Sequence, residues 1–188
     1  MPRFGWIAAL ALLAGCDPAP QTTAADASPP VEAAAAAPAS QDEVTLQILD
    51  YEGIQKLIAG HRGKFVVMDA WSTYCPPCVK EFPNLVQLSK KYPDELACIS
   101  LSFDYEGLDP PEVVQGPVLA FLQQQGATFD NVLSSEEADA LYRKLDLAAV
   151  PAVFVYDQQG SLLKRFDNST GEEVSYAEVE AYLAEQME

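Results

Sequence analysis

Nearly apolar runs that alternate with helical patterns constrain the fold of this chain more than any other feature. Residues 64–71 and 96–103 are almost entirely apolar, which is typical of buried parallel strands. Residues 44–49 alternate as a strand does, and residues 151–166 predict two strands joined by a turn at Gly160. Apolar residues at helical spacing predict helices at residues 51–60, 77–92, 118–125, 136–145 and 176–187. This order predicts an α/β fold, with a central mixed sheet and helices on both faces.

The first 43 residues differ in composition from the rest of the chain. Arg3 precedes an apolar run at residues 4–14, which is too short to cross a bilayer and predicts a secretory signal. The run ends in Leu-Ala-Gly-Cys at residues 13–16, which resembles a bacterial lipoprotein signal. That resemblance implies cleavage before Cys16, lipidation of its thiol and a location outside the cytoplasm on a membrane. A plain signal peptide with an unrelated cysteine is the alternative.

Residues 17–43 are rich in Ala, Pro, Thr, Ser and Gln and contain almost no large apolar side chain. Such a segment cannot bury enough surface to offset its conformational entropy, so it predicts a disordered tether. We therefore expect three parts: a signal peptide at residues 1–15, the lipidated cysteine with its tether at residues 16–43, and one folded domain at residues 44–188.

Charge and histidine content exclude several classes of function. The formal net charge is −17, so Lys and Arg are too few to neutralise the phosphates of a nucleic acid. His61 is the only histidine, and no Cys/His cluster has the spacing of a zinc site, so no metal is expected. The acidic surface is expected to be solvated, or to favour a basic partner such as an apocytochrome.

Cys75 and Cys78 lie where a buried strand passes into a helix. Proline is tolerated in the first helical turn, where the N–H groups have no intrahelical partner, so Pro76 and Pro77 mark the helix start. A residue before proline avoids the α region, which predicts that the helix begins near Pro77. At this position the pKa of a thiol falls from about 8.5 to about 3.5–7.5. Cys75 is therefore the expected nucleophile, and Cys78 would resolve the mixed disulfide.

Two structural interpretations of this pair are disfavoured. A stabilising disulfide that closes so short a loop restrains little of the unfolded chain, and half of a zinc site lacks its other ligands. Trp71 and Tyr74 are expected to flank the pair. Cys98 stands alone on a buried strand and is expected to be an inert, small hydrophobic residue, and His61 is expected on a surface loop.

The segment Trp-Ser-Thr-Tyr-Cys-Pro-Pro-Cys at residues 71–78, together with Asp69, Pro83 and the Val-Pro pair at residues 150–151, resembles the thioredoxin fold. More narrowly it resembles the TlpA/ResA-like thiol-disulfide oxidoreductases, which are lipoproteins or membrane-anchored proteins. The resemblance covers residues 44–188, and residues 104–145 occupy the place of that family's central insert.

The resemblance implies roles for three further residues. Pro151 would be a cis-proline that faces the disulfide, the alternative being a trans-proline that opens a strand. Asp69 would assist proton removal from Cys78, with its pKa raised by burial, although many relatives are expected to carry another polar residue there; a satisfied core aspartate is the alternative. Glu81 matches the glutamate of a Cys-x-x-Cys-x-x-Glu motif, and its helical spacing places it at the edge of the buried stripe. An exposed first-turn glutamate is its alternative.

The resemblance implies an enzyme that exchanges disulfides with partner proteins and needs no cofactor beyond the Cys75–Cys78 disulfide. Such proteins usually act as reductants outside the cytoplasm, with electrons from a membrane thiol donor, for example in cytochrome c or metal-site maturation. One alternative is a peroxiredoxin-like thiol peroxidase, although the sequence lacks the Pro-x-x-x-Thr-x-x-Cys setting of those enzymes. Another is a non-catalytic binding module of the cell envelope.

Overall fold

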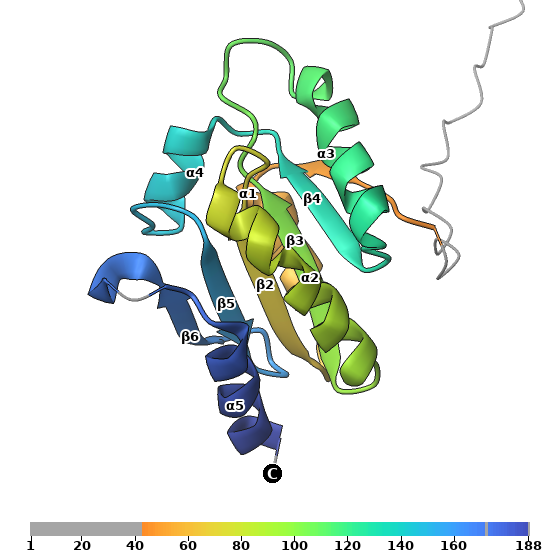
Figure 1. Cartoon of the computed structure of the whole chain (residues 1–188), viewed down its shortest axis with the longest axis vertical. Helices are drawn as coiled ribbons and strands as arrows, with labels where there is room; N and C mark the ends of the chain where they lie inside the picture. The colour runs from red at the N-terminus through yellow and green to blue at the C-terminus, as the bar shows by residue number, and fades with distance from the viewer. Residues whose placement is uncertain (1–42, 172, 188) are drawn as a thin grey trace, which may run out of the picture. The chain divides into compact units, whose positions relative to one another are not determined.

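A mixed six-stranded sheet organises the chain in the computed structural model, which describes residues 43–171 and 173–187 (Figure 1). The strand order is β1-β4-β3-β2-β5-β6. The strands are β1 (Gln47–Leu49), β2 (Phe65–Trp71), β3 (Leu96–Ser102), β4 (Asp130–Ser134), β5 (Ala152–Tyr156) and β6 (Leu162–Asp167). The helices are α1 (Tyr51–Gly60), α2 (Pro76–Lys91), α3 (Glu112–Gln125), α4 (Ala138–Lys144) and α5 (Tyr176–Met187), with a short 3-10 helix η1 (Asn168–Thr170).

The direction of the strands divides the sheet into two parts. Strands β1 to β4 pair in parallel, whereas β5 pairs antiparallel with both β2 and β6. Alternate residues of β2 face opposite sides: Val67 and Trp71 pack in a core with α2, α3 and α5, and Met68 packs in a second core with α1 and α4. The predicted α/β fold, with a mixed sheet and helices on both faces, is confirmed.

One strand was missed, and the bounds of α3 and β1 differ clearly from those expected. Strand β4 was not predicted, because polar Asn131 and Ser134 interrupt its apolar pattern; both are buried in the sheet, where Asn131 accepts a hydrogen bond from Ser100 Oγ at 2.8 Å. Helix α3 begins six residues earlier than the expected start at residue 118, because its first turns include Pro117 and expose most of their side chains. Strand β1 has three residues and is shorter than the predicted run.

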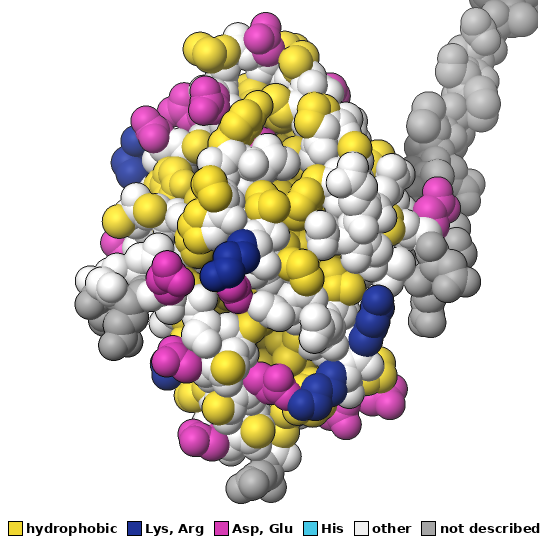
Figure 2. Space-filling view, in the orientation of Figure 1, with side chains coloured by type: hydrophobic (Ala, Val, Ile, Leu, Met, Phe, Trp, Pro, Cys, Tyr) yellow, Lys and Arg dark blue, Asp and Glu magenta, His cyan; other side chains and the backbone are white. Residues whose placement is uncertain are grey.

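The predicted signal peptide, Cys16 and the tether as far as residue 42 lie outside the described residues. None of the helices that the structure describes combines the length and apolar character that a membrane span requires. Acidic side chains are spread over the face shown in Figure 2, among hydrophobic side chains and a few from Lys and Arg. This distribution is consistent with the solvated acidic surface expected from the sequence.

Candidate active site

Cys75 and Cys78 form a disulfide at the start of α2, with their Cα atoms 5.2 Å apart. Cys75 is the N-cap residue in an extended conformation, and its Sγ accepts a hydrogen bond from the backbone N–H of Cys78 at 3.3 Å. Pro76 and Pro77 occupy the first helical turn. Backbone N–H groups have no intrahelical partner in this turn, so the helix loses no hydrogen bond to the prolines. The helix thus begins at Pro76, one residue before the expected start, because Cys75 alone serves as the cap.

The two sulfur atoms differ in accessibility. Cys75 is half-buried, whereas Cys78 is buried among the core side chains. A sulfur atom of another molecule therefore reaches Cys75 more easily than Cys78. The roles of nucleophile for Cys75 and resolving cysteine for Cys78 stay predictions.

Pro151 follows a cis peptide bond, as the resemblance implied. The carbonyl oxygen of Val150 lies 3.7 Å from Cys75 Sγ, which places this loop directly against the disulfide. A groove of about 340 Å³ runs between the loop and the start of α2, lined by Pro76, Pro77, Lys80, Glu81, Pro151, Asn168, Glu173 and Val174. We call it the Pro151 groove.

The turn that leads into Cys75 is held by Asp104, a buried carboxylate just beyond β3. Asp104 accepts hydrogen bonds from Ser72 Oγ at 3.3 Å, from the backbone N–H of Thr73 at 3.0 Å, and from the hydroxyls of Thr73 and Ser102. Asp104 was not among the predicted site residues. Its position at the carboxyl end of a buried parallel strand, where sites in α/β sheets gather, was the available signal.

The two aromatic residues expected to flank the cysteines occupy different environments. Trp71 is fully buried and packs against Phe82 and Phe121, with ring centroids 4.8 Å away in each case. It therefore supports α2 from inside the core. Tyr74 directly precedes Cys75 and is 79% exposed, so it belongs to the surface around the disulfide.

Asp69 is buried in β2, where the hydroxyl of Tyr176 donates a hydrogen bond to its Oδ2 at 2.8 Å. Burial raises the pKa of Asp69 to about 7, and the hydrogen bond from Tyr176 opposes part of that rise. The raised pKa agrees with the sequence-based expectation. Tyr176 was predicted only as the start of a helix, because nothing in its local sequence indicates contact with a residue 107 positions away.

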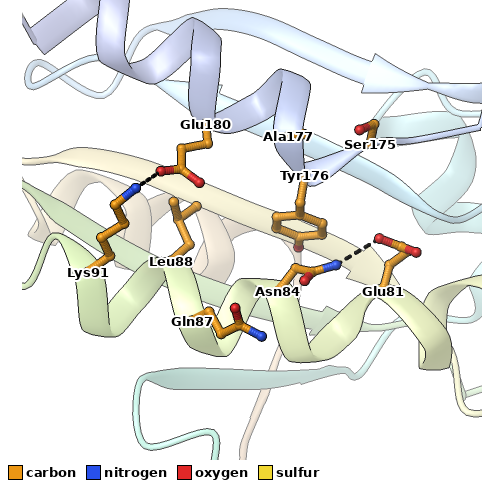
Figure 3. A pocket seen from close by; sticks show the side chains of 9 residues that line it. All are labelled: Glu81, Asn84, Gln87, Leu88, Lys91, Ser175, Tyr176, Ala177 and Glu180. Atoms are coloured by element: carbon orange, nitrogen blue, oxygen red, sulfur yellow. Dashed lines mark hydrogen bonds and ion pairs between the residues drawn. The ribbon is translucent and has the colours of Figure 1, made fainter.

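Glu81 is partly exposed on α2 and accepts a hydrogen bond from Asn84 Nδ2 at 2.8 Å. It lines the Pro151 groove and also a second cavity of about 430 Å³ between α2 and α5, shown in Figure 3. Tyr176 lines this second cavity, and its hydroxyl reaches Asp69. Tyr176 therefore shares a cavity with Glu81 and donates a hydrogen bond to Asp69.

Two other residues singled out in the sequence lie away from the disulfide. Cys98 is buried in β3, where burial, with a smaller contribution from Asp69, raises the pKa of its thiol to about 12. His61 Nε2 lies 2.8 Å from Asp130 Oδ2, which joins the loop before β2 to the start of β4. In residues 43–171 and 173–187, no cluster of three His, Cys, Asp or Glu side chains could hold a metal ion, and the expected absence of a metal stays a prediction.

The fold and the cysteine pair together define a thioredoxin-like protein with a redox-type Cys-x-x-Cys site. A family model described as Redoxin matches residues 32–183, and the chain belongs to this family. The matched segment includes the whole sheet and every side chain of the site.

Curated relatives agree with the resemblance to TlpA/ResA-like proteins. The chain is 28% identical over 99 residues to the thioredoxin-like protein YneN of Bacillus subtilis, covering 53% of this chain and 54% of that protein. It is 27% identical over 122 residues to the thiol:disulfide interchange protein HelX of Rhodobacter capsulatus (65% and 62%). It is also 27% identical over 119 residues to the thiol-disulfide oxidoreductase ResA of Geobacillus thermodenitrificans (61% and 61%). The matches span 54–62% of the length of these relatives.

Solved structures share the fold. A secreted disulfide oxidoreductase of Mycobacterium tuberculosis, homologous to E. coli DsbE, matches with a TM-score of 0.52 and 21% identity, covering 67% of this chain and 84% of that one. A DsbF homologue of Corynebacterium diphtheriae matches with a TM-score of 0.54 and 18% identity, covering 68% and 75%. The predicted thioredoxin-like fold is therefore confirmed.

Proposed function

We propose that the protein is a thiol-disulfide oxidoreductase that exchanges electrons with cysteine pairs of partner proteins. One observation carries the proposal: the half-buried Cys75 sulfur receives the Cys78 N–H at the tip of α2 and faces the Val150 carbonyl beside cis-Pro151. Similarity to HelX and ResA, which are named as thiol-disulfide proteins, supports it.

In the reducing direction, the Cys75 thiolate attacks one sulfur of a partner disulfide, and the other partner sulfur leaves as a thiolate. Cys78 then loses its proton and attacks the Cys75 sulfur of the mixed disulfide. The second partner sulfur leaves, and the Cys75–Cys78 disulfide forms, so that two electrons pass to the partner. The Cys78 N–H and the helix N-terminus stabilise negative charge on Cys75 before the attack.

Asp69 is the proposed base that takes the proton from Cys78. A pKa of about 7 suits this task, because near neutral pH the carboxylate is available and still basic enough to accept a proton. Tyr176 holds the carboxylate in place, and Glu81 lies where the α2/α5 cavity meets the Pro151 groove. We propose that protons leave the site for water along this side.

The setting of the reaction is also part of the proposal. The signal-like residues 1–16 support a lipid anchor at Cys16 and a location outside the cytoplasm. In an oxidising compartment, a dedicated reductant of this kind needs an electron source, for which we propose a membrane protein with a reactive thiol pair. Maturation of cytochrome c or of a metal site is the proposed destination of the electrons.

Reduction of insulin by dithiothreitol tests the activity. The wild-type domain should accelerate it, Cys75→Ser should not, and Cys98→Ala serves as the control. Cys78→Ala should retain partners as mixed disulfides in cell-envelope extracts, where mass spectrometry identifies them. A wild-type domain that leaves the insulin rate unchanged contradicts the proposal.

The reduction potential tests the direction. The reduction potential of the Cys75–Cys78 pair is measured by equilibration with a glutathione buffer. A value near −120 mV, at the strongly oxidising end of the known range, would indicate disulfide formation instead. Turnover of hydrogen peroxide that disappears in Cys75→Ser would favour the peroxidase alternative.

A further inference from the structure

We propose that a groove beside Tyr74 binds the partner polypeptide next to its reacting cysteine and selects segments that carry a large apolar side chain adjacent to Lys or Arg. The inference rests on the proposed function and adds a substrate preference to it. The groove has a volume of about 340 Å³ and lies between Tyr74 and the loop that joins β3 to α3. Its lining residues are Tyr74, Asp104, Tyr105, Glu106, Leu108, Asp109, Pro110, Val113 and Val114. We call it the Tyr74 groove.

Exposed apolar side chains gather in this groove. Tyr74 is 79% exposed, Leu108 86% and Val113 63%, and these are the three most exposed large hydrophobic residues in the part of the chain that the structure describes. All three line the same groove, and one of them directly precedes Cys75. Exposed hydrophobic side chains scattered singly need no explanation, whereas a cluster with a polar rim marks an interaction site.

Both walls of the groove are fixed relative to Cys75. Asp104, at the start of the loop between β3 and α3, accepts hydrogen bonds from Ser72 Oγ and from the backbone N–H of Thr73. These bonds join that loop to the turn that carries Tyr74. In that loop, the carbonyl of Tyr105 accepts a hydrogen bond from the backbone N–H of Ala138 at 2.9 Å. A segment bound in the groove therefore has a defined position relative to the sulfur of Cys75.

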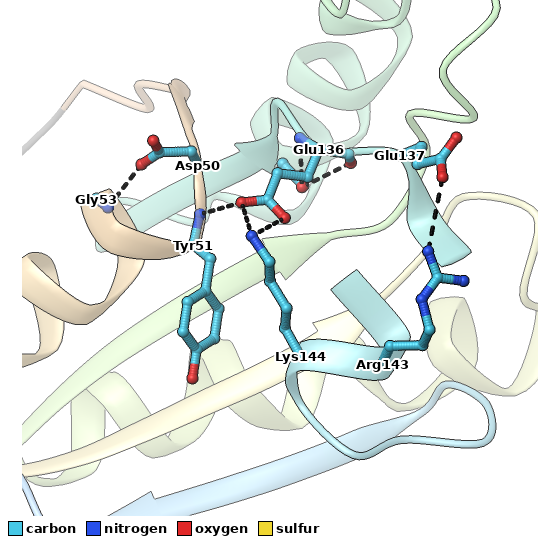
Figure 4. Close-up of polar contacts among 8 residues, drawn as sticks. Asp50, Tyr51, Gly53, Glu136, Glu137, Arg143 and Lys144 are labelled. Carbon is cyan, nitrogen blue, oxygen red and sulfur yellow. Dashed lines mark hydrogen bonds and ion pairs between the residues drawn. The ribbon is translucent and has the colours of Figure 1, made fainter. Parts of the chain in front are cut away.

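A glycine and the start of α4 complete the loop wall. Gly107 has a φ of 81°, and a Cβ at this position would lie 3.0 Å from the Glu137 side chain, so the loop needs glycine there. Figure 4 shows the neighbouring contacts, in which Glu136 pairs with Lys144 at 2.7 Å and Glu137 with Arg143 at 3.8 Å. The loop thus rests against a segment that has its own polar contacts, which supports a preformed groove.

The charge of the groove indicates the chemistry of its occupant. Three carboxylates line it, and no Lys or Arg does so among the described residues. Asp104 is already occupied by hydrogen bonds inside the protein, which leaves the exposed Glu106 and Asp109 for a partner. Figure 2 shows hydrophobic and acidic side chains at the top of the molecule, where the loop between β3 and α3 lies. A cationic side chain complements this rim, and an acidic one is repelled.

The Tyr74 groove and the Pro151 groove are lined by residues on either side of Cys75 in the chain. Tyr74 precedes Cys75 and lines the first groove, whereas Pro76 follows Cys75 and lines the second, which also contains Lys80. A polypeptide that crosses Cys75 can contact both. Because the exposed apolar side chains and uncompensated carboxylates belong to the Tyr74 groove, the side-chain preference is assigned to that groove.

Two disulfide-bonded peptides test the preference with the reduced full-length chain. They are identical except beside the target cysteine, where one carries Leu-Lys and the other Ser-Glu. We expect kcat/KM for the Leu-Lys peptide to be about tenfold higher, mainly through KM, since burying one apolar anchor typically changes binding by this factor or more. The preference should weaken at 1 M salt, because surface charges are then screened within about 3 Å.

Substitutions in the Tyr74 groove test which side chains cause the preference. Leu108→Ser with Val113→Ser should remove most of the advantage of the Leu-Lys peptide, and Glu106→Gln with Asp109→Asn should remove its salt-dependent part. Each rate is divided by the rate of the same variant with hydroxyethyl disulfide, so that changes in folding or thiol reactivity cancel. The matched control is Leu162→Ser with Leu163→Ser on β6, whose side chains are 53% and 38% exposed, and it should keep the full preference.

The outcomes separate this inference from the proposed function. A wild-type chain that reduces hydroxyethyl disulfide, and reduces the two peptides with equal kcat/KM, contradicts the preference assigned to the Tyr74 groove. The proposed oxidoreductase activity would then still stand. A preference that survives in the Leu108/Val113 variant also contradicts the assignment to the Tyr74 groove. A chain that reduces none of the three disulfides overturns the proposed function, and the groove with it.

Discussion

The surroundings of Cys75 and of Cys98 place the same side chain in opposite electrostatic settings. Cys75 is half-buried at the tip of α2, where the N–H of Cys78 points at its sulfur. Cys98 is buried in the middle of β3 near the Asp69 carboxyl, and burial is the main cause that raises the pKa of its thiol to about 12. An N–H group directed at the sulfur and contact with water therefore favour a thiolate, whereas burial in a strand beside a carboxyl disfavours it.

The largest expected effect is the loss of the thiol at the helix tip. Cys75→Ser should lower the catalysed rate of insulin reduction, taken above the rate with dithiothreitol alone, at least about a thousandfold, because a serine hydroxyl is a far weaker nucleophile at neutral pH and forms no disulfide. The rate of insulin reduction is measured with dithiothreitol as the electron source. A variant that retains a tenth of the wild-type rate would show that Cys75 is not the nucleophile.

Asp69→Asn tests the buried side of the comparison through stability. The pKa of Asp69 is about 7 in the folded chain against a usual 3.8, so the folded state binds this proton more tightly than the unfolded state. Folding stability therefore falls as pH rises from about 4 to about 7, and levels off above that range. Asparagine cannot ionise, so the variant should be more stable than wild type at pH 8 by roughly 4 kcal/mol, with little difference at pH 4.

Urea unfolding of the oxidised protein at several pH values measures this difference. Asp109→Asn is the matched control, because it removes one carboxylate at an exposed position and leaves β2 unchanged. Equal slopes for wild type and Asp69→Asn would show that the Asp69 carboxyl does not titrate in this range.

Tyr176→Phe should have a smaller effect on the same carboxyl. The hydrogen bond from Tyr176 lowers the pKa of Asp69, so its removal should move the pH midpoint of the stability change upward. The ionised carboxylate also loses a buried donor, which should cost about 1–3 kcal/mol of stability at pH 8 and less at pH 5. The same urea series measures both changes. A midpoint that moves downward would contradict the assigned role of this hydrogen bond.

Cys98→Ala should have the smallest effect. The insulin rate should stay within about twofold of wild type, because a buried neutral thiol is a poor nucleophile. In the reduced chain, iodoacetamide should label Cys75 long before Cys98, as peptide mass spectrometry of timed samples will measure. Labelling of both residues at similar rates would show that the sheet opens readily around β3.

The strongest local patterns predicted their elements well. Residues 64–71 and 96–103 became β2 and β3 with at most one residue of difference at each end, and the helix expected at residues 176–187 became α5 (Tyr176–Met187). These segments repeat their apolar residues at a clear period, and the period records which face is buried. The Cys75–Cys78 pair and the cis-Pro151 were predicted from motif and resemblance.

The missed features depend on contacts between distant residues. Asn131 weakens the apolar pattern of β4, but Ser100 satisfies it across the sheet, 31 residues away in sequence. Asp104 and Tyr176 act through hydrogen bonds that span 31 and 107 positions. Local periodicity contains no record of such pairs, so the partners of Asn131 and Tyr176 could not be predicted, whereas the position of Asp104 just after β3 was a usable signal.

The position of Glu81 at the border of two cavities has a consequence for the order of events in a catalytic cycle. A polypeptide lying along cis-Pro151 would seal the carboxylate from the solvent on that side. The cavity between α2 and α5 stays uncovered, because it extends along α2 from Glu81 towards Lys91 and shares only Glu81 with the lining of the Pro151 groove. On the proposed proton route, docking and proton release can therefore proceed at the same time, because Glu81 lines both cavities.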